Sequence, residues 1–400
     1  MSSGARAIAA VGVCALHLAL LAPTVGSWSS VLEGDFAPEA EAIESGERPY
    51  EDQELEYPPL SIAPIVGPAL LGEGTDDYIE AFQWEMLAFD LAIVLLLSLA
   101  LPGDRRLVLS ALGIYSVGII ALSGIVLDDS LIDEAPLALA RFDLVPAFLV
   151  LAAVLARKAD RSATWSGLLA LGVAVKAFPL LLFPALVREE RRPRRVAVAA
   201  AIPLLLSAAV VIAWGDDFYS AISFHTDRDL QVEAVAATPF EIANLLGAEA
   251  SSEFGKGSWN LIAGGAELAR ALSLAAMIYA YVLVLWGGWR EQTEQLRLAT
   301  ALLAVFVVLY PVLSPQFLLW LLPLSAAAYG LGKENLLLLA AVVLTELALR
   351  HYDDAIGDLH ADFVWRIAGR NLVLIAYLCL VCGPIVRGLG WAPWRAASST

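Results

Sequence analysis

Ten apolar runs, each bounded by charged residues, restrict what this chain can fold into more than any other feature of its sequence. Hydrophobic residues make up 59% of the chain, and a helix must cross ~30 Å of hydrocarbon to span a bilayer. Lipid offers backbone amides no partner, and the runs lack the period of two of barrel strands, so each run is expected to be helical. The sequence predicts an all-α polytopic membrane protein, one integral membrane domain over 1–400, with about ten spans near 7–26, 82–102, 107–127, 137–156, 196–214, 262–286, 297–313, 317–331, 335–350 and 367–387.

The basic residues predict how these spans are oriented. By the positive-inside rule the side that collects them is cytoplasmic, and both termini then lie there. The mostly acidic loops, among them a second outer loop over 215–261, fall on the outside. The first run is interpreted as a retained span, because it is long for a secretory signal. The basic residues on the cytoplasmic side are Arg105, Arg106, Arg157, Lys158, Arg161, the run from Arg188 to Arg195, Arg290, Arg297, Lys333, Arg387 and Arg395.

The first outer loop, residues 27–81, is long and strongly acidic, and short amphipathic helices are expected in it. From residue 26 to 81 there are 14 acidic residues against the single Arg48, a local charge of −13 out of −17 for the chain. Most of this excess is typical of a solvated loop that is not retained inside the cell. One or two of the carboxylates remain as candidates for chemistry at the membrane surface.

The segment 157–195 breaks the simple alternation of sides. Both of its flanks are basic, and its apolar centre contains Lys176-Ala177-Phe178-Pro179. A re-entrant hairpin of two short helices keeps both flanks on the cytoplasmic side and places Lys176 at its tip. Irregular backbone at that depth is tolerated only where it lines a polar cavity, and a lysine there needs a partner. The alternative is a plain span with a snorkelling lysine. Pro315 predicts a similar break between the runs 297–313 and 317–331.

Four stretches together resemble one family. They are Asp35 in the first outer loop, Tyr57-Pro58-Pro59 at its end, Gly172 to Pro179 in the hairpin, and Leu313-Ser314-Pro315-Gln316 with the following residues to Pro323. They look like bacterial GT-C glycosyltransferases, and more narrowly like the branch of polyprenyl-phosphate-mannose-dependent alpha-mannosyltransferases. The resemblance covers roughly residues 5–385, and each motif is weak on its own.

The resemblance implies a GT-C-like fold with an active site on the outer face of the plasma membrane. It also implies a polyprenyl-phosphate sugar donor with mannose as its sugar, a glycolipid or glycan acceptor, and a single displacement with inversion. An acidic residue of the first outer loop then acts as general base, and Asp35 is the position that matches. A partly desolvated aspartate can accept the proton of an attacking hydroxyl. Glu33 is the nearest competitor for this role.

Cations are expected to face the leaving phosphate, because negative charge accumulates on its oxygen. Lys176, Arg141 and Arg228 are the candidates; Arg141 can instead pair with Asp143. Tyr57 and Gln316 are expected to contact substrate through their motifs. His225, in a stretch that also resembles the mannosyltransferase-like branch, shares a helix face with Arg228 if the segment is helical.

Other classes of function fit the sequence less well. The acidic balance argues against nucleic acid, which needs a basic face. Neither a metal nor a cofactor is expected, because a donor with one phosphate needs a metal less than a pyrophosphate donor does. A secondary transporter with broken helices near the midplane is the main alternative, but it usually carries an internal repeat, and none is found here. A scaffold subunit would leave Lys176 unexplained.

Overall fold

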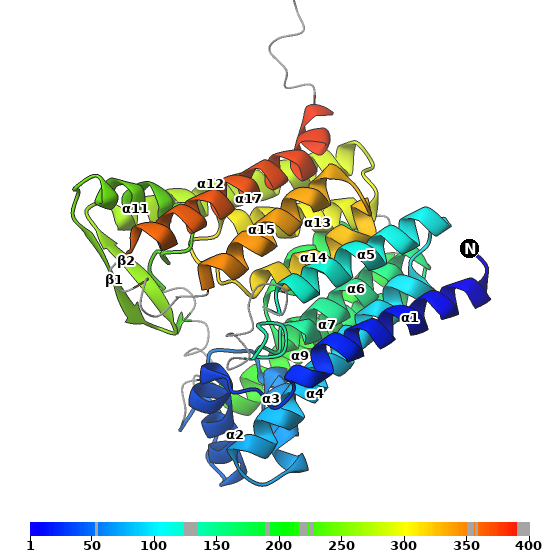
Figure 1. The fold of residues 1–400 in the computed structure, drawn as a ribbon. Helices are drawn as coiled ribbons and strands as arrows, with labels where there is room; N and C mark the ends of the chain where they lie inside the picture. The colour runs from blue at the N-terminus through cyan, green and yellow to red at the C-terminus, as the bar shows by residue number, and fades with distance from the viewer. Residues whose placement is uncertain are drawn as a thin grey trace, which may run out of the picture.

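The computed structural model describes residues 1–52, 55–123, 135–188, 193–215, 223–224, 228–349, 356 and 359–389. Within these residues the chain forms a bundle of helices with two lobes at one end (Figure 1). The helices of the bundle are α1 (Ser3–Leu21), α4 (Thr75–Leu95), α5 (Arg105–Ala121), α6 (Leu144–Lys158), α7 (Ser162–Val175), α8 (Phe183–Val187), α9 (Pro193–Trp214), α12 (Ala266–Arg290), α13 (Gln295–Leu309), α14 (Phe317–Tyr329), α15 (Lys333–Leu349) and α17 (Ala361–Arg387).

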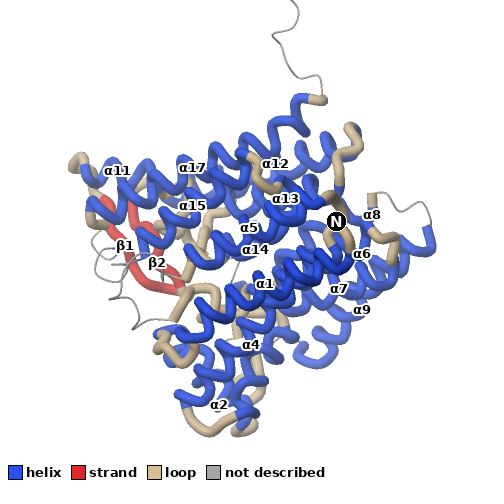
Figure 2. Tube along the Cα trace, turned by 45° about the vertical axis from the view of Figure 1, so that its right-hand side comes forward, coloured by secondary structure: helices blue, strands red, loops and turns tan. Residues whose placement is uncertain are grey.

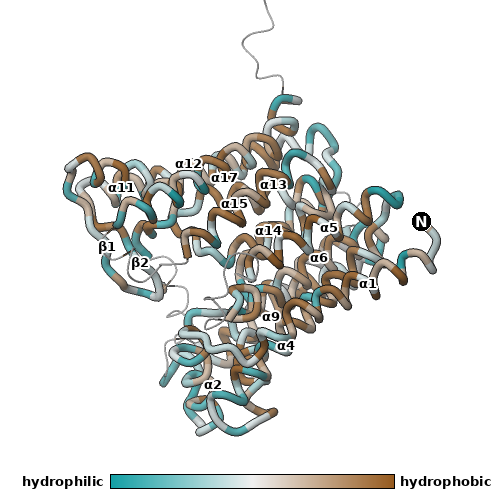
Figure 3. The backbone as a smooth tube through the Cα atoms, viewed as in Figure 1, coloured by the Kyte–Doolittle hydropathy of each residue, from teal (hydrophilic) through white to brown (hydrophobic). Residues whose placement is uncertain are grey.

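A helix lies in each of the predicted spans, and the chain is a helical membrane protein. Among the described residues, four helical stretches are both long and apolar enough to cross a membrane: Ser3–Thr24, Thr75–Ala100, Ala266–Arg290 and Ala361–Arg387. The others are shorter or less apolar, so the number of spans stays a prediction. Apolar residues run along the helices, and polar residues gather toward their ends and in the lobes (Figure 3). This distribution is the one that a bilayer requires of a multi-helix protein.

Contacts between helix ends bring the basic clusters together at one end of the bundle, called the basic end here. Lys158 at the end of α6 forms an ion pair with Glu294 before α13. Arg297 lies over the ring of Tyr329 at the end of α14, 5.6 Å from its centroid. Arg6 donates to three backbone carbonyls in and before the turn between α4 and α5. Lys158 and Arg297, two of the basic residues that the sequence assigns to one side, therefore lie at this end together with Arg6; which side of the membrane it faces stays a prediction.

The two lobes lie at the opposite end. The first lobe, residues 26–52 and 55–74, contains a π-helical turn (Leu32–Phe36), α2 (Ala37–Glu44), α3 (Ile62–Val66) and the 3-10 turns Pro59–Ser61 and Gly67–Leu71. The buried side chain of Gln83 in α4 anchors the start of the first lobe. It accepts a hydrogen bond from the Gly26 amide and donates one to the Ser27 carbonyl. The second lobe, residues 228–263, contains α11 (Thr238–Leu245) and a β-hairpin. The described part of the first lobe therefore contains short helices, and its place as an outer loop over 27–81 stays a prediction.

The β-hairpin makes the prediction of an all-α fold wrong in the second lobe. Strands β1 (Ala250–Gly255) and β2 (Ser258–Ala263) pair antiparallel, and they are the strands drawn red in Figure 2. Lys256 and Gly257 connect them with φ values of 49° and 65°, as a two-residue type I′ turn requires. Because β2 includes residues 262–263, the predicted span 262–286 begins too early; α12 begins at Ala266.

The segment from α7 to α8 doubles back on itself. Helix α7 ends at Val175, Lys176 is extended, and a 3-10 turn (Phe178–Leu182) leads into α8. The rings of Trp165, near the start of α7, and Phe183, at the start of α8, have centroids 6.4 Å apart. The chain therefore returns toward the basic end, and the re-entrant hairpin over 157–195, with its placement in a membrane, stays a prediction.

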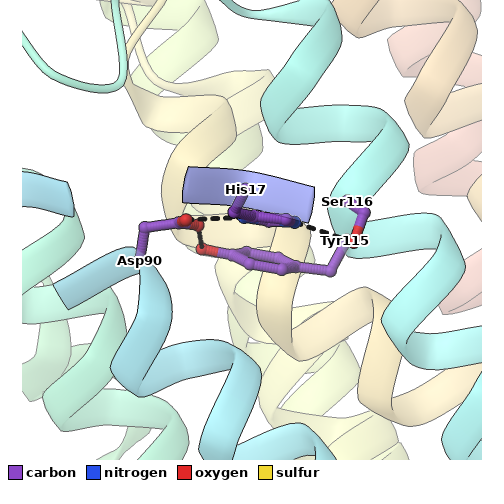
Figure 4. Close-up of polar contacts among 4 residues, drawn as sticks. All are labelled: His17, Asp90, Tyr115 and Ser116. Atoms are coloured by element: carbon purple, nitrogen blue, oxygen red, sulfur yellow. Dashed lines mark hydrogen bonds and ion pairs between the residues drawn. The ribbon is translucent and has the colours of Figure 1, made fainter. Parts of the chain in front are cut away.

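A polar cluster joins α1, α4 and α5 inside the bundle (Figure 4). His17 Nδ1 lies 2.6 Å from Asp90 Oδ2, and His17 Nε2 lies 2.8 Å from Ser116 Oγ. The Tyr115 hydroxyl donates to the other oxygen of Asp90 at 2.8 Å. All four side chains are buried. Polar groups buried between apolar helices stabilise a structure only when they are paired, and this cluster pairs its carboxylate completely.

Candidate active site

Asp35 lies on the π-helical turn that runs directly into α2, and its side chain is exposed at the surface. The turn is held by Phe36, whose buried ring has its centroid 5.6 Å from that of Phe142 and 6.3 Å from that of Tyr57. Desolvation by the surrounding protein raises the pKa of the Asp35 carboxyl although the side chain stays accessible. The charge of Arg141 opposes this rise, and that of Glu56 adds to it. Asp35 is thus an accessible carboxylate with a neighbouring cation.

Two further carboxyls, Glu39 and Glu56, lie close to Asp35. Glu39 follows one turn later, and its Oε2 atom is buried without a hydrogen-bond partner among the described residues. Burial raises the pKa of Glu39 to about 8, and the charges of Glu56 and Asp35 add to the rise. Burial, together with a side-chain hydrogen bond to Glu56, also raises the pKa of the Tyr57 phenol well above its ordinary value. Glu33 is held differently, because it accepts a hydrogen bond from the Trp28 indole.

Lys176 lies at the break after α7, and Asp143, directly before α6, is its partner. Lys176 Nζ is 2.8 Å from Asp143 Oδ1, and the Trp320 indole donates to the same oxygen at 2.6 Å. Nζ also lies 5.1 Å from the ring centroid of Tyr57, 4.8 Å from that of Phe142 and 5.3 Å from that of Trp320. These distances are within the range of cation–π attraction. The lysine therefore has both a counter-charge and an aromatic enclosure.

Of the two alternatives for Arg141, a phosphate or the Asp143 carboxylate, the structure does not show the pair with Asp143. Among the residues that the structure describes, Arg141 forms no hydrogen bond or ion pair, and its side chain is half-buried. Its charge acts on Asp35 and on Tyr57. Asp143 is instead occupied by Lys176 and Trp320. Arg141 is consequently a cation within electrostatic reach of Asp35, and no described residue accepts from its N–H donors.

Arg228 belongs to the second lobe. Its guanidinium lies over the Phe224 ring at 5.6 Å, and its Nε is buried without a hydrogen-bond partner among the described residues. A Cβ added to Gly257, at the tip of the β-hairpin, would lie 3.7 Å from Phe224 and 3.9 Å from Glu56. The hairpin tip therefore connects the surroundings of Arg228 with the first lobe.

The two remaining predicted site residues are Gln316 and His225. Gln316 is the residue before α14, where its carbonyl accepts from the Leu319 amide and its side chain is half-buried. Because Gln316 directly precedes the helix that carries Trp320, its motif is linked to the cluster through that helix. His225 lies outside the described residues. No group of three His, Cys, Asp or Glu side chains in the described part of the chain is arranged to hold a metal ion.

Asp143 and Trp320 are the site residues that sequence reasoning missed. Asp143 was considered only as a partner for its neighbour two residues before, whereas Lys176 is 33 residues away and Trp320 is 177 residues away. One usable signal was present: a lysine in an apolar run needs a buried carboxylate, and Asp143 directly precedes another apolar run. Glu39 and Glu56 could not be separated from the other acids of the loop.

The fold and the cluster define a helical membrane protein with carboxylates, cations and aromatic rings gathered at the lobed end. The family model of glycosyltransferase family 87 matches residues 55–315, more than half of the 400 residues. The chain therefore belongs to glycosyltransferase family 87, and it is a membrane glycosyltransferase. No curated protein matches the chain. The matched range contains Tyr57, Arg141, Lys176 and Arg228, but neither Asp35 nor Gln316.

Proposed function

We propose that this glycosyltransferase moves mannose from a polyprenyl-phosphate donor to a lipid-linked or glycan acceptor on the outer face of the plasma membrane. The observation that carries the proposal is the placement of an accessible carboxylate, Asp35, within electrostatic reach of Arg141, whose guanidinium has no hydrogen-bond partner among the described residues. A transfer from a phosphate leaving group needs both a proton acceptor and a cation. The reaction is a single displacement with inversion.

Asp35 is the general base in this proposal. It takes the proton of the acceptor hydroxyl as the hydroxyl oxygen attacks the anomeric carbon and the bond to the phosphate oxygen breaks. A carboxyl whose pKa is raised, as that of Asp35 is, is a stronger proton acceptor while it is ionised. Arg141, which opposes the rise, keeps the ionised form accessible.

The cations stabilise the departing phosphate. Arg141 comes first, because a guanidinium can bind a phosphate through two parallel hydrogen bonds and these donors are not used within the described protein. Lys176 comes second, because one of its hydrogen bonds is already given to Asp143. Arg228, with its buried and unpartnered Nε, is the third candidate and would act from the second lobe. Tyr57, His225 and Gln316 are proposed substrate contacts.

The role of Asp35 is tested by Asp35→Asn, with Glu33→Gln as the matched control. The first change should leave membrane insertion intact and lower the transfer rate by about 10²–10⁴-fold, the usual cost of losing a positioned base. Glu33→Gln should leave the rate close to that of the wild type. The assay is transfer of radiolabelled sugar in membranes. Full activity of Asp35→Asn together with loss in Glu33→Gln would move the role to Glu33.

The donor is tested in the same membranes with a panel of polyprenyl-phosphate sugars and, separately, nucleotide sugars. The proposal expects transfer from polyprenyl-phosphate-mannose and none from nucleotide sugars. Transfer from another polyprenyl-phosphate sugar would correct the sugar and keep the donor class. Transfer from a nucleotide sugar alone would overturn the donor class.

The orientation is tested by single cysteines in a variant whose three native cysteines are replaced. Cysteines at Ser45 in the first lobe and Ser251 in the second should react with an impermeant thiol reagent in intact cells, whereas one at Gln292, at the basic end, should not. All three positions are exposed. Labelling of Gln292→Cys without the other two would place the lobes in the cytoplasm.

A further inference from the structure

Two interruptions of the helices meet at one point of the bundle. One is the extended Lys176 after α7, and the other is the turn that ends at Gln316, before α14. The rings of Phe178, just after the first break, and Trp320, in the first turn after the second, are stacked with centroids 4.0 Å apart and planes 10° apart. The two broken segments are therefore in direct contact.

Asp143 lies at this meeting point and joins three parts of the chain. Its side chain is 1% exposed. One carboxylate oxygen, Oδ1, accepts hydrogen bonds from both the Lys176 ammonium and the Trp320 indole. Tyr57 of the first lobe contributes a ring to the enclosure of Lys176. The Lys176 side chain stays 12% exposed. The lysine is thus held from behind while part of it remains accessible.

Stability alone does not account for this arrangement. The free-energy cost of desolvating a carboxylate and an ammonium is about as large as the attraction between them. Replacing a buried ion pair by apolar residues therefore often leaves the stability unchanged or raises it. Two donors on one carboxylate oxygen, however, define where the ammonium lies. A lysine on a flexible four-carbon stem gains more from such a restraint than a planar guanidinium does.

We propose that Asp143 and Trp320 are positioning residues, which hold the Lys176 ammonium at the junction of the two broken segments so that it faces the phosphate of a prenyl-phosphate ligand. The inference rests on the proposed function and adds to it how the second cation is placed. Lys176 has three N–H donors, and one is used by Asp143. No described residue accepts from the others, so they can reach a phosphate oxygen, and three aromatic rings surround the ammonium with centroids 4.8 to 5.3 Å away.

The test combines two single variants with their double variant. Asp143→Asn and Lys176→Met each leave the other group without its partner, whereas the double variant removes both charges together. Two quantities are measured in nanodiscs: thermal unfolding, and binding of a short-chain prenyl phosphate without sugar. Each single variant should unfold at a lower temperature and bind the prenyl phosphate about tenfold more weakly or worse, the effect of losing one charge-assisted hydrogen bond.

The double variant separates a positioning role from a structural one. It should unfold near the wild-type temperature, because no unpaired charge remains, yet its binding of the prenyl phosphate should stay about tenfold weaker. Recovery of both quantities would mean that the pair only stabilises the fold, and the proposal would be overturned. Trp320→Phe, which keeps the ring and removes the indole donor, should weaken binding about threefold, since only a neutral donor is lost.

The buried pair of His17 and Asp90 supplies the matched control. Asp90→Asn should lower the unfolding temperature while folded protein binds the prenyl phosphate as the wild type does. Equal loss of binding in this control would mean that any loosened buried pair has the effect, and it would overturn the positioning role. A wild type that binds the prenyl phosphate but transfers no sugar would instead refute the proposed function and leave the positioning role standing. A wild type that does not bind it would refute the positioning role.

Discussion

Asp90 and Asp143 are two buried carboxylates with the same kinds of partner. Each accepts from an aromatic side chain, the Tyr115 hydroxyl or the Trp320 indole. Each also lies within 2.8 Å of a group that can carry a positive charge, His17 for Asp90 and Lys176 for Asp143. Their settings differ. Asp90 lies between the uninterrupted helices α1, α4 and α5 (Figure 4), whereas Asp143 lies at the junction of two broken segments.

The difference teaches that partner chemistry alone does not identify a functional site. In the Asp90 cluster every polar side chain is buried and every partner belongs to the cluster. In the Asp143 cluster the lysine stays partly accessible, and Arg141, two residues before Asp143, has no hydrogen-bond partner among the described residues. The first cluster is expected to hold helices together, and the second to act on a ligand. Stability and activity should therefore respond differently at the two places.

Among the changes that compare the two clusters, the largest effect should come from Lys176→Met, measured as the initial rate of sugar transfer at saturating acceptor. Losing one charge-assisted contact to the leaving phosphate should reduce the rate by about 10²–10³-fold. Lys158→Met is the matched control, because Lys158 forms its ion pair at the basic end, and it should keep the wild-type rate within about twofold. Equal donor saturation curves for wild type and Lys176→Met would make the two carboxylate clusters equivalent and both structural.

The next effect is on stability. Asp90→Leu leaves His17 buried without its carboxylate, and breaking a buried pair in this way should lower the free energy of unfolding by about 3–5 kcal/mol. The transfer rate per folded molecule should stay unchanged. Chemical unfolding in detergent micelles gives the free energy, and the double variant with His17→Leu should recover most of it. A lowered rate in folded protein would contradict the division between the two clusters.

A smaller decrease in the free energy of unfolding is expected from Tyr115→Phe, which removes only the hydroxyl that donates to Asp90. A hydrogen bond to a charged group contributes about 1.5–3 kcal/mol, and unfolding should become easier by this amount. Tyr279→Phe is the control, because Tyr279 is 60% exposed on α12, and it should leave the free energy of unfolding unchanged. If both variants behave alike, the Asp90 cluster does not stabilise the bundle.

The smallest expected effect is a pH dependence of local stability, and it concerns Glu39 of the first lobe. One oxygen of this carboxyl is buried without a hydrogen-bond partner among the described residues. Its pKa is raised to about 8 from 4.5, so the folded lobe binds this proton more tightly than the unfolded chain does. The resulting stability is fully present below about pH 4.5 and is lost as the pH rises through about 8. Hydrogen exchange of residues 26–52 should therefore quicken over this window beyond the intrinsic pH effect.

Glu39→Gln should remove that pH dependence, because the amide does not titrate. Glu41→Gln, at an exposed position of the same helix, is the control and should keep it. Persistence of the dependence in Glu39→Gln would assign it to another carboxyl of the lobe. A carboxyl without a cationic partner would then behave no differently from the paired ones.

Much of the fold could be predicted because hydrophobicity and helix breaks are local properties. The apolar runs predicted the helices, and Lys176 and Pro315 predicted where two of them are interrupted. The β-hairpin was missed although Gly255-Lys256-Gly257 offered a turn signal. Its second strand is apolar and merges with the run of α12, so an apolar window did not separate the two elements.

The site could be predicted only in its chemistry. A lysine within an apolar run demanded a partner, and the sequence offered Asp143 as one of several carboxylates. That Asp143 serves Lys176 instead of Arg141 depends on how α6, α7 and α14 pack. The first lobe shows the same limit: Asp35 was chosen by its distance from the first span, while the burial of Glu39 depends on the contacts of α2.

The sequence by itself determined that this chain is a helical membrane protein, where its helices break, and how its charges are divided between its two ends. These follow from the cost of exposing backbone and charge to lipid, which acts on each segment separately. Only the tertiary structure decided which carboxylate holds which cation. The partners of Asp143 lie 33 and 177 residues away, and such pairs form only after the helices have packed.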